Sequence, residues 1–472
     1  MLPFSITLSR FVFFAFLTSH GCVFGYDGVG DNHGVVHGSI RETNAATVKP
    51  MITKLVHPVA GNELVHIQRK ISSGESYKDM KDGIHDRRLE VWTQRGFDID
   101  GEAAADGFGS SVSVSYDGRI IAIGAPLNDA GVVNVNNNRG HVRVYSWNNT
   151  NYVQRGADIN GEAANDRFGT SVSISYDGNT FAAGAPRNNG IAINNTNTGH
   201  VRVFTWNNSH YVQRGSDIDG EADFDFSGTS LSISGDGLLL AIGAPLNDGN
   251  GSNSGHVRVY IWNGTAHVQR GIDIDGEAAN DLFGTSVSLS YAGDVLAVGA
   301  PFNDPGGNNN RGHVRVFTWN NSHYVQRGSD IDGVANTERS GTSTSISGDG
   351  LVLAIGAPFN DGNGTNSGHV RVYIWNSTTN TYVKRGNDLK GKAAFEEFGT
   401  SVSLSYRGYA LTVGAPINGT DVKGRVRVYT WDGMQYIQKG RDILGGANGG
   451  LIWKVSFTIS HWPSRGNRGT CE

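Results

Sequence analysis

Residues 168–186 read FGTSVSISYDGNTFAAGAP, and this stretch determines the fold. Ser171–Ser175 alternates small polar and apolar side chains, which is typical of a half-buried strand. Asp177-Gly178 is the signal for a two-residue hairpin turn, because both central positions of that turn need positive φ. The chain then runs through an apolar strand into Gly184-Ala185-Pro186. The stretch therefore predicts two antiparallel strands joined by a tight turn.

The same stretch recurs along the chain. Gly-Ala-Pro begins at Gly124, Gly184, Gly243, Gly299, Gly356 and Gly414, so successive copies lie 56 to 60 residues apart. After each copy and a loop, runs such as His200–Trp206 and Tyr211–Gln213 add two more strands, and no window shows a useful helical period. Four antiparallel strands in a repeat of this length are the blade of a β-propeller. A solenoid would have a shorter period, and an immunoglobulin-like sandwich would not repeat so closely.

The composition agrees with short strands and many turns. The 472 residues include 66 glycines, while 18% are charged and 38% are hydrophobic, which excludes a helical bundle, a coiled coil and wholesale disorder. The net charge is −5 and there is no basic block, so nucleic acid is not expected as a partner. The two cysteines, Cys22 and Cys471, lie at opposite ends and exclude a disulfide framework or a cysteine metal site.

Phe108-Gly109 followed by Gly124-Ala125-Pro126 resembles the FG-GAP repeat, the unit of the β-propeller of integrin α subunits. The resemblance departs where Ser227 and Ser340 replace the phenylalanine. It implies a propeller over residues 87–472, with units near 98–157, 158–216, 217–272, 273–329, 330–387 and 388–441 and a partial unit at 442–472. Seven blades are the family norm. We therefore expect six full blades and a seventh closed by terminal strands at 91–96 and 453–460, with six blades as the alternative.

The N-terminus reads as an export signal. In residues 1–25, Arg10 precedes an apolar run at 11–17, and Val23 and Gly25 offer a small-residue cleavage site. The apolar run is too short to span a bilayer. Residues 26–86 show no repeat and are expected to form an N-terminal extension of unclear structure. We therefore expect a secreted, extracellular or cell-surface protein with no membrane span in this chain.

The order of strands predicts which face binds ligand. In a four-stranded meander, the loops from strand two to three and from strand four to the next blade emerge together. The corresponding face of integrins binds ligand, so the resemblance and the long polar loops agree. The ligand-face candidates are Asn128, Asp129, Asn247, Asp248, Asn303, Asp304, Asn360 and Asp361.

An acidic segment on that face raises the question of calcium. Asp98, Asp100, Glu102 and Asp106 lie at relative positions 1, 3, 5 and 9, a spacing that resembles calcium loops. The other candidate ligands are Asp158, Glu162, Asp166, Asp217, Asp219, Glu221, Asp225, Asp273, Asp275, Glu277 and Asp281. However, the glycine lies at position 4 rather than 6, and the hairpin that holds the integrin calcium motif is too short here. The alternative is that these side chains cap turns or pair with recurrent arginines.

Three more residue types recur. Histidines open the third strand of successive units at His141, His200, His256, His313 and His369, where the sixth unit has Arg425. Five equivalent histidines indicate a structural or shared surface role. Tryptophans end that strand at Trp147, Trp206, Trp262, Trp319, Trp375 and Trp431, and are expected to pack between blades or else to stack on sugars. The next residues form sequons, which makes Asn148, Asn207, Asn263, Asn320 and Asn376 candidate glycosylation sites.

No catalytic motif is present in the sequence: it has no nucleophile elbow, zinc-protease helix or phosphate-binding loop. We therefore expect a non-catalytic propeller that binds an extracellular protein or glycan through the loops of one face. The alternatives are a multivalent lectin with one sugar site per blade, and a propeller hydrolase with a carboxylate pair. The sequence does not indicate an oligomeric state.

Overall fold

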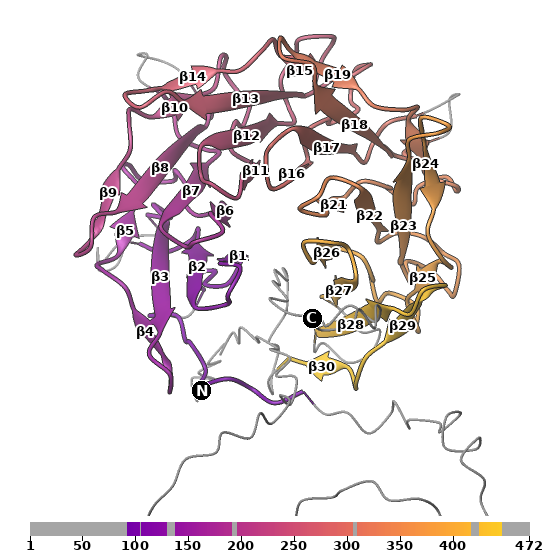
Figure 1. Cartoon of the computed structure of the whole chain (residues 1–472). Helices are drawn as coiled ribbons and strands as arrows, with labels where there is room; N and C mark the ends of the chain where they lie inside the picture. The colour runs from indigo at the N-terminus through magenta and orange to yellow at the C-terminus, as the bar shows by residue number, and fades with distance from the viewer. Residues whose placement is uncertain are drawn as a thin grey trace, which may run out of the picture. The chain divides into compact units, whose positions relative to one another are not determined.

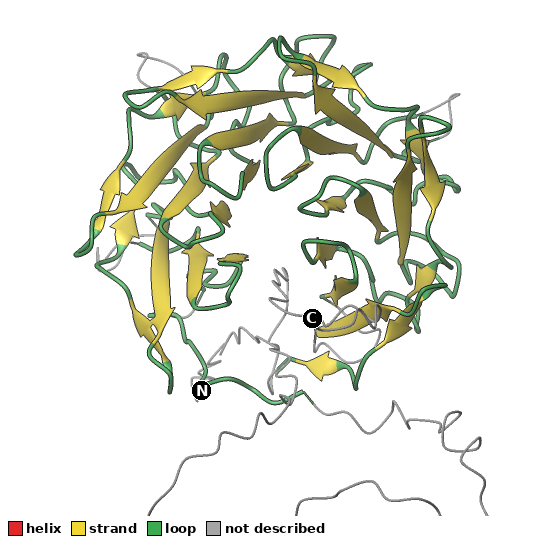
Figure 2. Cartoon of the chain, viewed as in Figure 1, coloured by secondary structure: helices red, strands yellow, loops and turns green. Residues whose placement is uncertain are grey.

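The computed structural model describes residues 92–445, apart from residue 104 and residues 130–136, 191–195, 305–308 and 417–423. All regular elements in this part of the chain are strands, as Figure 2 shows. No helix capable of crossing a membrane occurs among these residues. The predicted signal peptide and the extension at 26–86 lie outside the described residues.

The thirty strands form six antiparallel sheets arranged around one axis, which confirms the predicted propeller blades (Figure 1). Blade 1 contains β1 (Ser111–Val114), β2 (Ile120–Ala125), β3 (His141–Trp147), β4 (Tyr152–Gln154) and β5 (Ile159–Asn160), and blade 2 contains β6 (Ser171–Ile174), β7 (Thr180–Ala185), β8 (His200–Trp206), β9 (Tyr211–Gln213) and β10 (Ile218–Asp219). Blade 3 contains β11 (Ser230–Ile233), β12 (Leu239–Ala244), β13 (His256–Trp262), β14 (His267–Gln269) and β15 (Ile274–Asp275), and blade 4 contains β16 (Ser286–Leu289), β17 (Val295–Ala300), β18 (His313–Trp319), β19 (Tyr324–Gln326) and β20 (Ile331–Asp332). Blade 5 contains β21 (Ser343–Ile346), β22 (Val352–Ala357), β23 (His369–Asn376), β24 (Thr381–Lys384) and β25 (Leu389–Lys390), and blade 6 contains β26 (Ser401–Leu404), β27 (Ala410–Ala415), β28 (Arg425–Trp431), β29 (Tyr436–Gln438) and β30 (Ile443–Leu444).

The fourth strand of every blade is divided into two pieces. In blade 2, β9 pairs with the end of β8, and β10 pairs with its beginning, where Asp219 lies opposite His200. Between the two pieces, Gly215 has a positive φ and packs against the Trp262 ring of the next blade. The outer edge therefore leaves its own sheet briefly to contact the neighbouring blade.

The FG-GAP motif forms the contact between neighbouring blades. Gly184 of blade 2 faces the backbone of Gly228 in blade 3 so closely that a Cβ on Gly184 would overlap the Gly228 carbonyl oxygen. Ser171 donates its hydroxyl to the same oxygen at 2.7 Å. Glycine is required at this position because only hydrogen fits between the two chains.

The hydrophobic core lies between blades. One cluster joins Val142 and Val144 of blade 1 to Phe168 and Phe181 on the blade 2 side, all of them buried. The recurrent tryptophans lie at these boundaries too: Trp319 packs against the cluster between blades 3 and 4. The prediction that tryptophans pack between blades is therefore confirmed.

The tips of the hairpins between first and second strands meet on one face. The Tyr116 and Tyr176 rings stack with centroids 3.9 Å apart, and Tyr291 and Tyr406 complete a cluster of four. The backbone links the tips as well, because Tyr176 N donates to Gly235 O and Gly235 N donates to Tyr291 O. The cluster thus joins tips from four different blades.

The six predicted repeat units all form blades. At the N-terminal side, the Arg95 guanidinium lies 4.1 Å from the centroid of the Trp147 ring, the position that Arg155 takes over Trp206. Residues 92–96 thus contact blade 1 as the end of a preceding fourth strand would. The other strand predicted for a seventh blade, at 453–460, lies outside the described residues.

Candidate functional site

The strand register places the long loops and the acidic segments on one face, here called the loop face. His200 begins β8 and lies opposite Ala185 at the end of β7 and opposite Asp219 in β10. The loop from β7 to β8 and the segment that follows β10 therefore start at the same end of the sheet. The same register recurs in every blade.

The carboxylates of one acidic segment do not converge on one point. Asp166, at position 9, is buried and accepts hydrogen bonds from Ala163 N at 2.7 Å and from Asn188 Nδ2 at 3.1 Å. Asp158, at position 1, instead accepts two hydrogen bonds from Arg143 at 2.8 Å. One segment thus contributes to two separate sets of contacts, and its spacing does not form a single calcium loop.

The predicted ligand-face residues fall into two groups. The asparagines are buried, and each donates its side-chain amide to the acidic residue that lies 22 positions earlier: Asn128 to Asp106, Asn247 to Asp225, Asn303 to Asp281 and Asn360 to Glu338. These buried hydrogen bonds stabilise the loops, and the asparagine side chains do not lie on the surface where a ligand would bind. The neighbouring aspartates lie nearer the surface and cap their own loops, as Asp248 does by accepting from Asn253 N at 2.7 Å.

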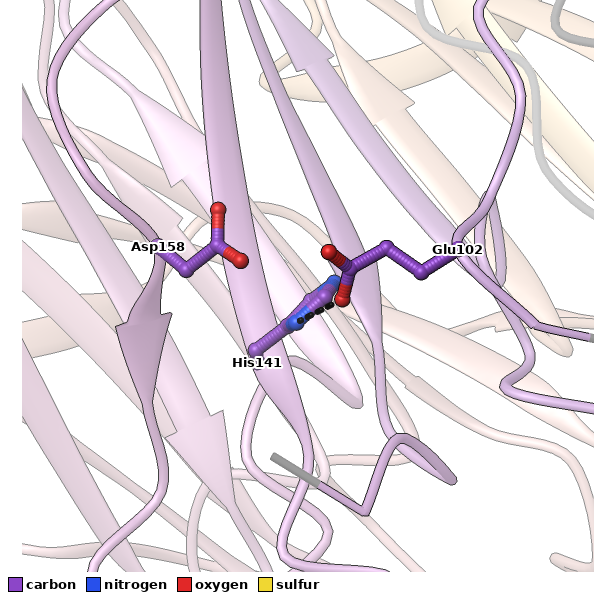
Figure 3. Close-up of side chains that lie close together, drawn as sticks. All are labelled: Glu102, His141 and Asp158. Carbon is purple, nitrogen blue, oxygen red and sulfur yellow. Dashed lines mark ion pairs between the residues drawn. The ribbon is translucent and has the colours of Figure 1, made fainter. Parts of the chain in front are cut away.

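The histidine that opens the third strand lies between two acidic segments in blades 1–4. In Figure 3, Glu102 approaches His141 from one side and Asp158 lies on the other side of the ring. The four clusters are Glu102, His141 and Asp158; Glu162, His200 and Asp217; Glu221, His256 and Asp273; and Glu277, His313 and Asp330. In each, one nitrogen and two carboxylate oxygens lie within 4.8 Å of one another. Such a set could hold a metal ion.

Sequence reasoning did not find these clusters, because each combines the glutamate of one unit with the aspartate that begins the next. A signal was present nevertheless. Units 1–4 keep the glutamate and the histidine together, whereas the fifth has Val334 in place of the glutamate and the sixth has Lys392 and Arg425 in place of both.

The arginine two residues after the histidine divides the clusters into two kinds. In blade 1, Arg143 forms ion pairs with both Glu102 and Asp158, and the hydrogen bonds from Arg143 lower the pKa of Asp158. In blade 3, Arg258 similarly pairs with Glu221 and lies 3.4 Å from Asp273. In these two clusters an internal cation therefore pairs with both carboxylates and offsets part of their charge.

In blades 2 and 4 the arginine points elsewhere. Arg202 donates to the Asn160 carbonyl and lies 4.3 Å from the centroid of the Phe168 ring. Its Nη1 remains 3.6 Å from Glu162, and no ion pair joins it to Asp217 among the described residues. Burial raises the pKa of Glu162, with the nearby Asp217 charge adding to the effect. Two carboxylates thus face each other with incomplete charge compensation.

Blade 4 repeats this arrangement. Arg315 donates to the Asp275 carbonyl and lies 4.3 Å from the centroid of the Phe283 ring. Burial raises the pKa of Glu277, although Arg315 opposes the shift. In both blades the arginine thus lies over the phenylalanine of the FG-GAP motif.

The loop face also carries two exposed phenylalanines in an unusual backbone conformation. Phe224 and Phe395 occupy equivalent positions, with φ of 65° and 60° and exposed fractions of 54% and 52%. Asn165 and Asn280 occupy the same position in other units, also at positive φ. A bulky side chain in this region is strained, so these two phenylalanines are retained at some cost.

The candidate glycosylation sites lie on the opposite face. Asn207 follows Trp206 in the turn between β8 and β9, where its Oδ1 accepts from Ser209 N and His210 N. Asn148, Asn263, Asn320 and Asn376 occupy equivalent turns. Carbohydrate at these positions would leave the loop face uncovered.

Comparisons with known proteins agree with this architecture. A sequence model of the FG-GAP repeat matches residues 216–260 and 272–317. Human integrin alpha-11 is 34% identical over 163 residues, which are 31% of this chain and 12% of the integrin. The chain thus matches only a small part of that relative's length. The predicted resemblance to an FG-GAP, integrin-α-like propeller is confirmed.

A solved structure gives the fold alone. The crystal structure of a candidate 6-phosphogluconolactonase from Bacteroides uniformis superposes with a TM-score of 0.50 at 12% identity. The match covers 74% of this chain and 89% of the other. At this identity the likeness extends to the propeller fold and not to chemistry.

Proposed function

We propose that this FG-GAP, integrin-α-like propeller is an extracellular adhesion or recognition module that binds a protein or glycan through its loop face, without catalysis. The observation that carries the proposal is the pair Phe224 and Phe395, exposed on that face in left-handed conformation. Strained residues persist where function retains them. Exposed aromatic side chains are, moreover, the usual anchors of protein interfaces.

The surroundings of these two aromatic side chains suit a protein or a glycan partner. Acidic and amide side chains such as Asp248, Asn250 and Asp361 lie exposed in the loops of the same face. Aromatic residues together with polar, solvent-accessible ones are typical of recognition surfaces. The similarity to integrin alpha-11 supports the same class of function.

The structure does not favour the lectin alternative at the tryptophans. One face of each ring is covered by an arginine of the preceding blade or segment, at 4.1 to 4.9 Å from the ring centroid. A tyrosine or histidine ring of the same blade also packs against each tryptophan, with centroids 4.8 to 5.2 Å apart. Sugar stacking needs an open ring face, and these contacts argue against a sugar site on each tryptophan. A glycan ligand is therefore expected to bind through the loops, as a protein ligand would.

The experiment is a binding screen of the purified full chain against immobilised extracellular-matrix proteins and a glycan array. Phe224→Ser and Phe395→Ser are expected to weaken any binding at least tenfold, which corresponds to a hot-spot residue. Met434→Ser is the matched control, since Met434 is 80% exposed in the turn between β28 and β29 on the opposite face. Binding that survives both phenylalanine changes and is lost with Met434→Ser would contradict the proposal.

A further inference from the structure

We propose that blades 2 and 4 each hold one divalent transition-metal cation of the zinc or manganese type. The sites are the His200 cluster (Glu162, His200 and Asp217) and the His313 cluster (Glu277, His313 and Asp330). The inference concerns metal binding only and is independent of the proposed recognition function.

The histidine ring of each cluster is buried without a hydrogen bond to the carboxylates beside it. The His200 side chain is 1% exposed, and its Nδ1 lies 3.8 Å from Asp217 Oδ2 and 4.0 Å from Asp219 Oδ1. These distances exceed a hydrogen bond, and Nε2 is buried without a partner. His313 is equally buried, with Nδ1 3.9 Å from Glu277 Oε2 and Nε2 again unpartnered. Nδ1 is the nitrogen that faces the carboxylates in both clusters, and a cation between the ring and the carboxylates would bind it there.

The charges at the equivalent positions of blade 6 also favour a cation in blades 2 and 4. There Lys392 replaces the glutamate, and its Nζ lies 3.2 Å from Asp442, the equivalent of Asp217. Arg425 replaces the histidine and lies 3.2 Å from the same carboxylate. Blade 6 thus has side-chain cations in the place where blades 2 and 4 have a neutral ring and a second carboxylate. A bound cation would restore in those blades the balance that Lys392 and Arg425 provide in blade 6.

The arginines explain why the sites are limited to two blades. Arg143 and Arg258 already pair with both carboxylates of their clusters. A guanidinium between the two carboxylates repels a metal ion and occupies the oxygens that would bind it. Arg202 and Arg315 instead donate to backbone carbonyls and lie over Phe168 and Phe283. Each keeps one long contact, of 3.6 Å to Glu162 and 3.7 Å to Glu277, and neither forms an ion pair with the aspartate of its cluster among the described residues.

The donor set indicates the class of metal. Calcium and magnesium prefer oxygen ligands alone, whereas a neutral imidazole with carboxylates suits zinc and related first-row cations. Donor atoms within 4.8 Å of one another need only small side-chain rotations to reach bonds of about 2.0–2.2 Å. Asp219 lies close enough in blade 2 to be a fourth ligand.

The test is a zinc titration of the full chain, with any affinity tag removed, by competition with a chromogenic chelator at pH 7.5. Manganese and calcium are titrated in parallel. We expect two zinc equivalents per chain and weaker or no calcium binding. Glu162→Lys introduces the blade 6 residue at the first site and is expected to remove one equivalent. Glu162→Lys combined with Glu277→Lys is expected to remove both.

Two controls separate this outcome from lost folding and from surface binding. His369→Gln changes an equally buried histidine in blade 5, where Val334 replaces the glutamate, and should leave both equivalents in place. His210→Gln removes an exposed surface histidine and should also leave both. The proposal is overturned if no zinc binds, if the double lysine variant still binds two equivalents, or if His210→Gln removes an equivalent.

Discussion

The Arg155 guanidinium, at the end of the fourth strand of blade 1, lies 4.3 Å from the centroid of the Trp206 ring in blade 2. It also donates to the Gly178 carbonyl at 3.0 Å and to Asn179 Oδ1 at 2.8 Å. The arginine thus connects the outer edge of one blade to both the third strand and the hairpin of the next. Arg214, Arg270, Arg327 and Arg385 repeat the stacking at later interfaces.

Arg155→Ala is expected to lower the free energy of unfolding by about 2–3 kcal/mol, because it removes a partly buried cation–π contact and two hydrogen bonds. Urea denaturation monitored by tryptophan fluorescence measures the change. Arg119→Ala, in an exposed turn, is the control and should stay within about 0.5 kcal/mol of the unchanged chain. Equal effects of the two variants would show that the stacking contributes nothing.

Gly184→Ala is expected to destabilise the chain by about 3 kcal/mol, because the added methyl overlaps the Gly228 carbonyl across the boundary between blades 2 and 3. The comparison is Gly264→Ala, where a Cβ meets no atom within 4 Å but φ is 101°. That variant should cost about 1–2 kcal/mol from backbone strain alone. A smaller effect at Gly184 than at Gly264 would contradict the close-contact explanation.

Phe224→Asn is expected to raise the free energy of unfolding by about 1 kcal/mol, because asparagine tolerates the left-handed region that Phe224 occupies. Asn165 and Asn280 already occupy this position in other units. The measurement is the urea midpoint of the full chain. A loss of stability would mean that the phenylalanine ring makes a packing contribution larger than its backbone strain.

His369 should make stability depend on pH. Burial, reinforced by Arg371, lowers the pKa of His369 from 6.5 to about 4. The unfolded chain therefore takes up a proton as the pH falls through 6.5, while the folded chain does so only near 4. The stabilising contribution is complete above pH 6.5 and is lost as the pH falls towards 4, at up to about 1.4 kcal/mol per pH unit.

His369→Gln is expected to reduce the slope of unfolding free energy against pH by about 1 kcal/mol per unit between pH 6.5 and 4. Denaturation series at pH 7, 6 and 5 in EDTA measure the slope. His210→Gln, at an exposed turn, serves as the comparison. An unchanged slope in His369→Gln would contradict a neutral buried imidazole.

The strands could be predicted because their signals are local. The alternation in Ser171–Ser175 and the turn at Asp177-Gly178 each lie within a few residues, and both recur in the structure as expected. The division of the fourth strand was not predicted, because the break lies at Gly215, which packs against the Trp262 ring of another blade. The residue pattern within one repeat unit does not show which side chain of the next blade lies against it.

The candidate site was harder to predict for a related reason. The sequence predicts that Asn247 is an exposed loop residue. In the structure it is buried and donates a hydrogen bond to Asp225, a contact that forms only when the chain folds. Likewise, Glu162 and Asp217 belong to different repeat units and meet at His200. The spacing within one acidic segment resembles that of a calcium loop. In the structure, the first aspartate and the glutamate of a segment belong to two different clusters.

The tyrosine cluster at the hairpin tips bears on how the blades assemble. Gly235 and Gly348 stand where other blades carry tyrosine, and the space that a side chain would need there is filled by the rings of Tyr291 and Tyr406. Repeats this similar can dock onto the wrong neighbour during folding. A tip bearing tyrosine in the place of Gly235 would collide with Tyr291. From blade 2 to blade 6 the tips alternate between tyrosine and glycine, so a tip with tyrosine does not fit in the place of blade 3 or blade 5. This restricts the order in which a nearly repetitive chain can assemble its blades.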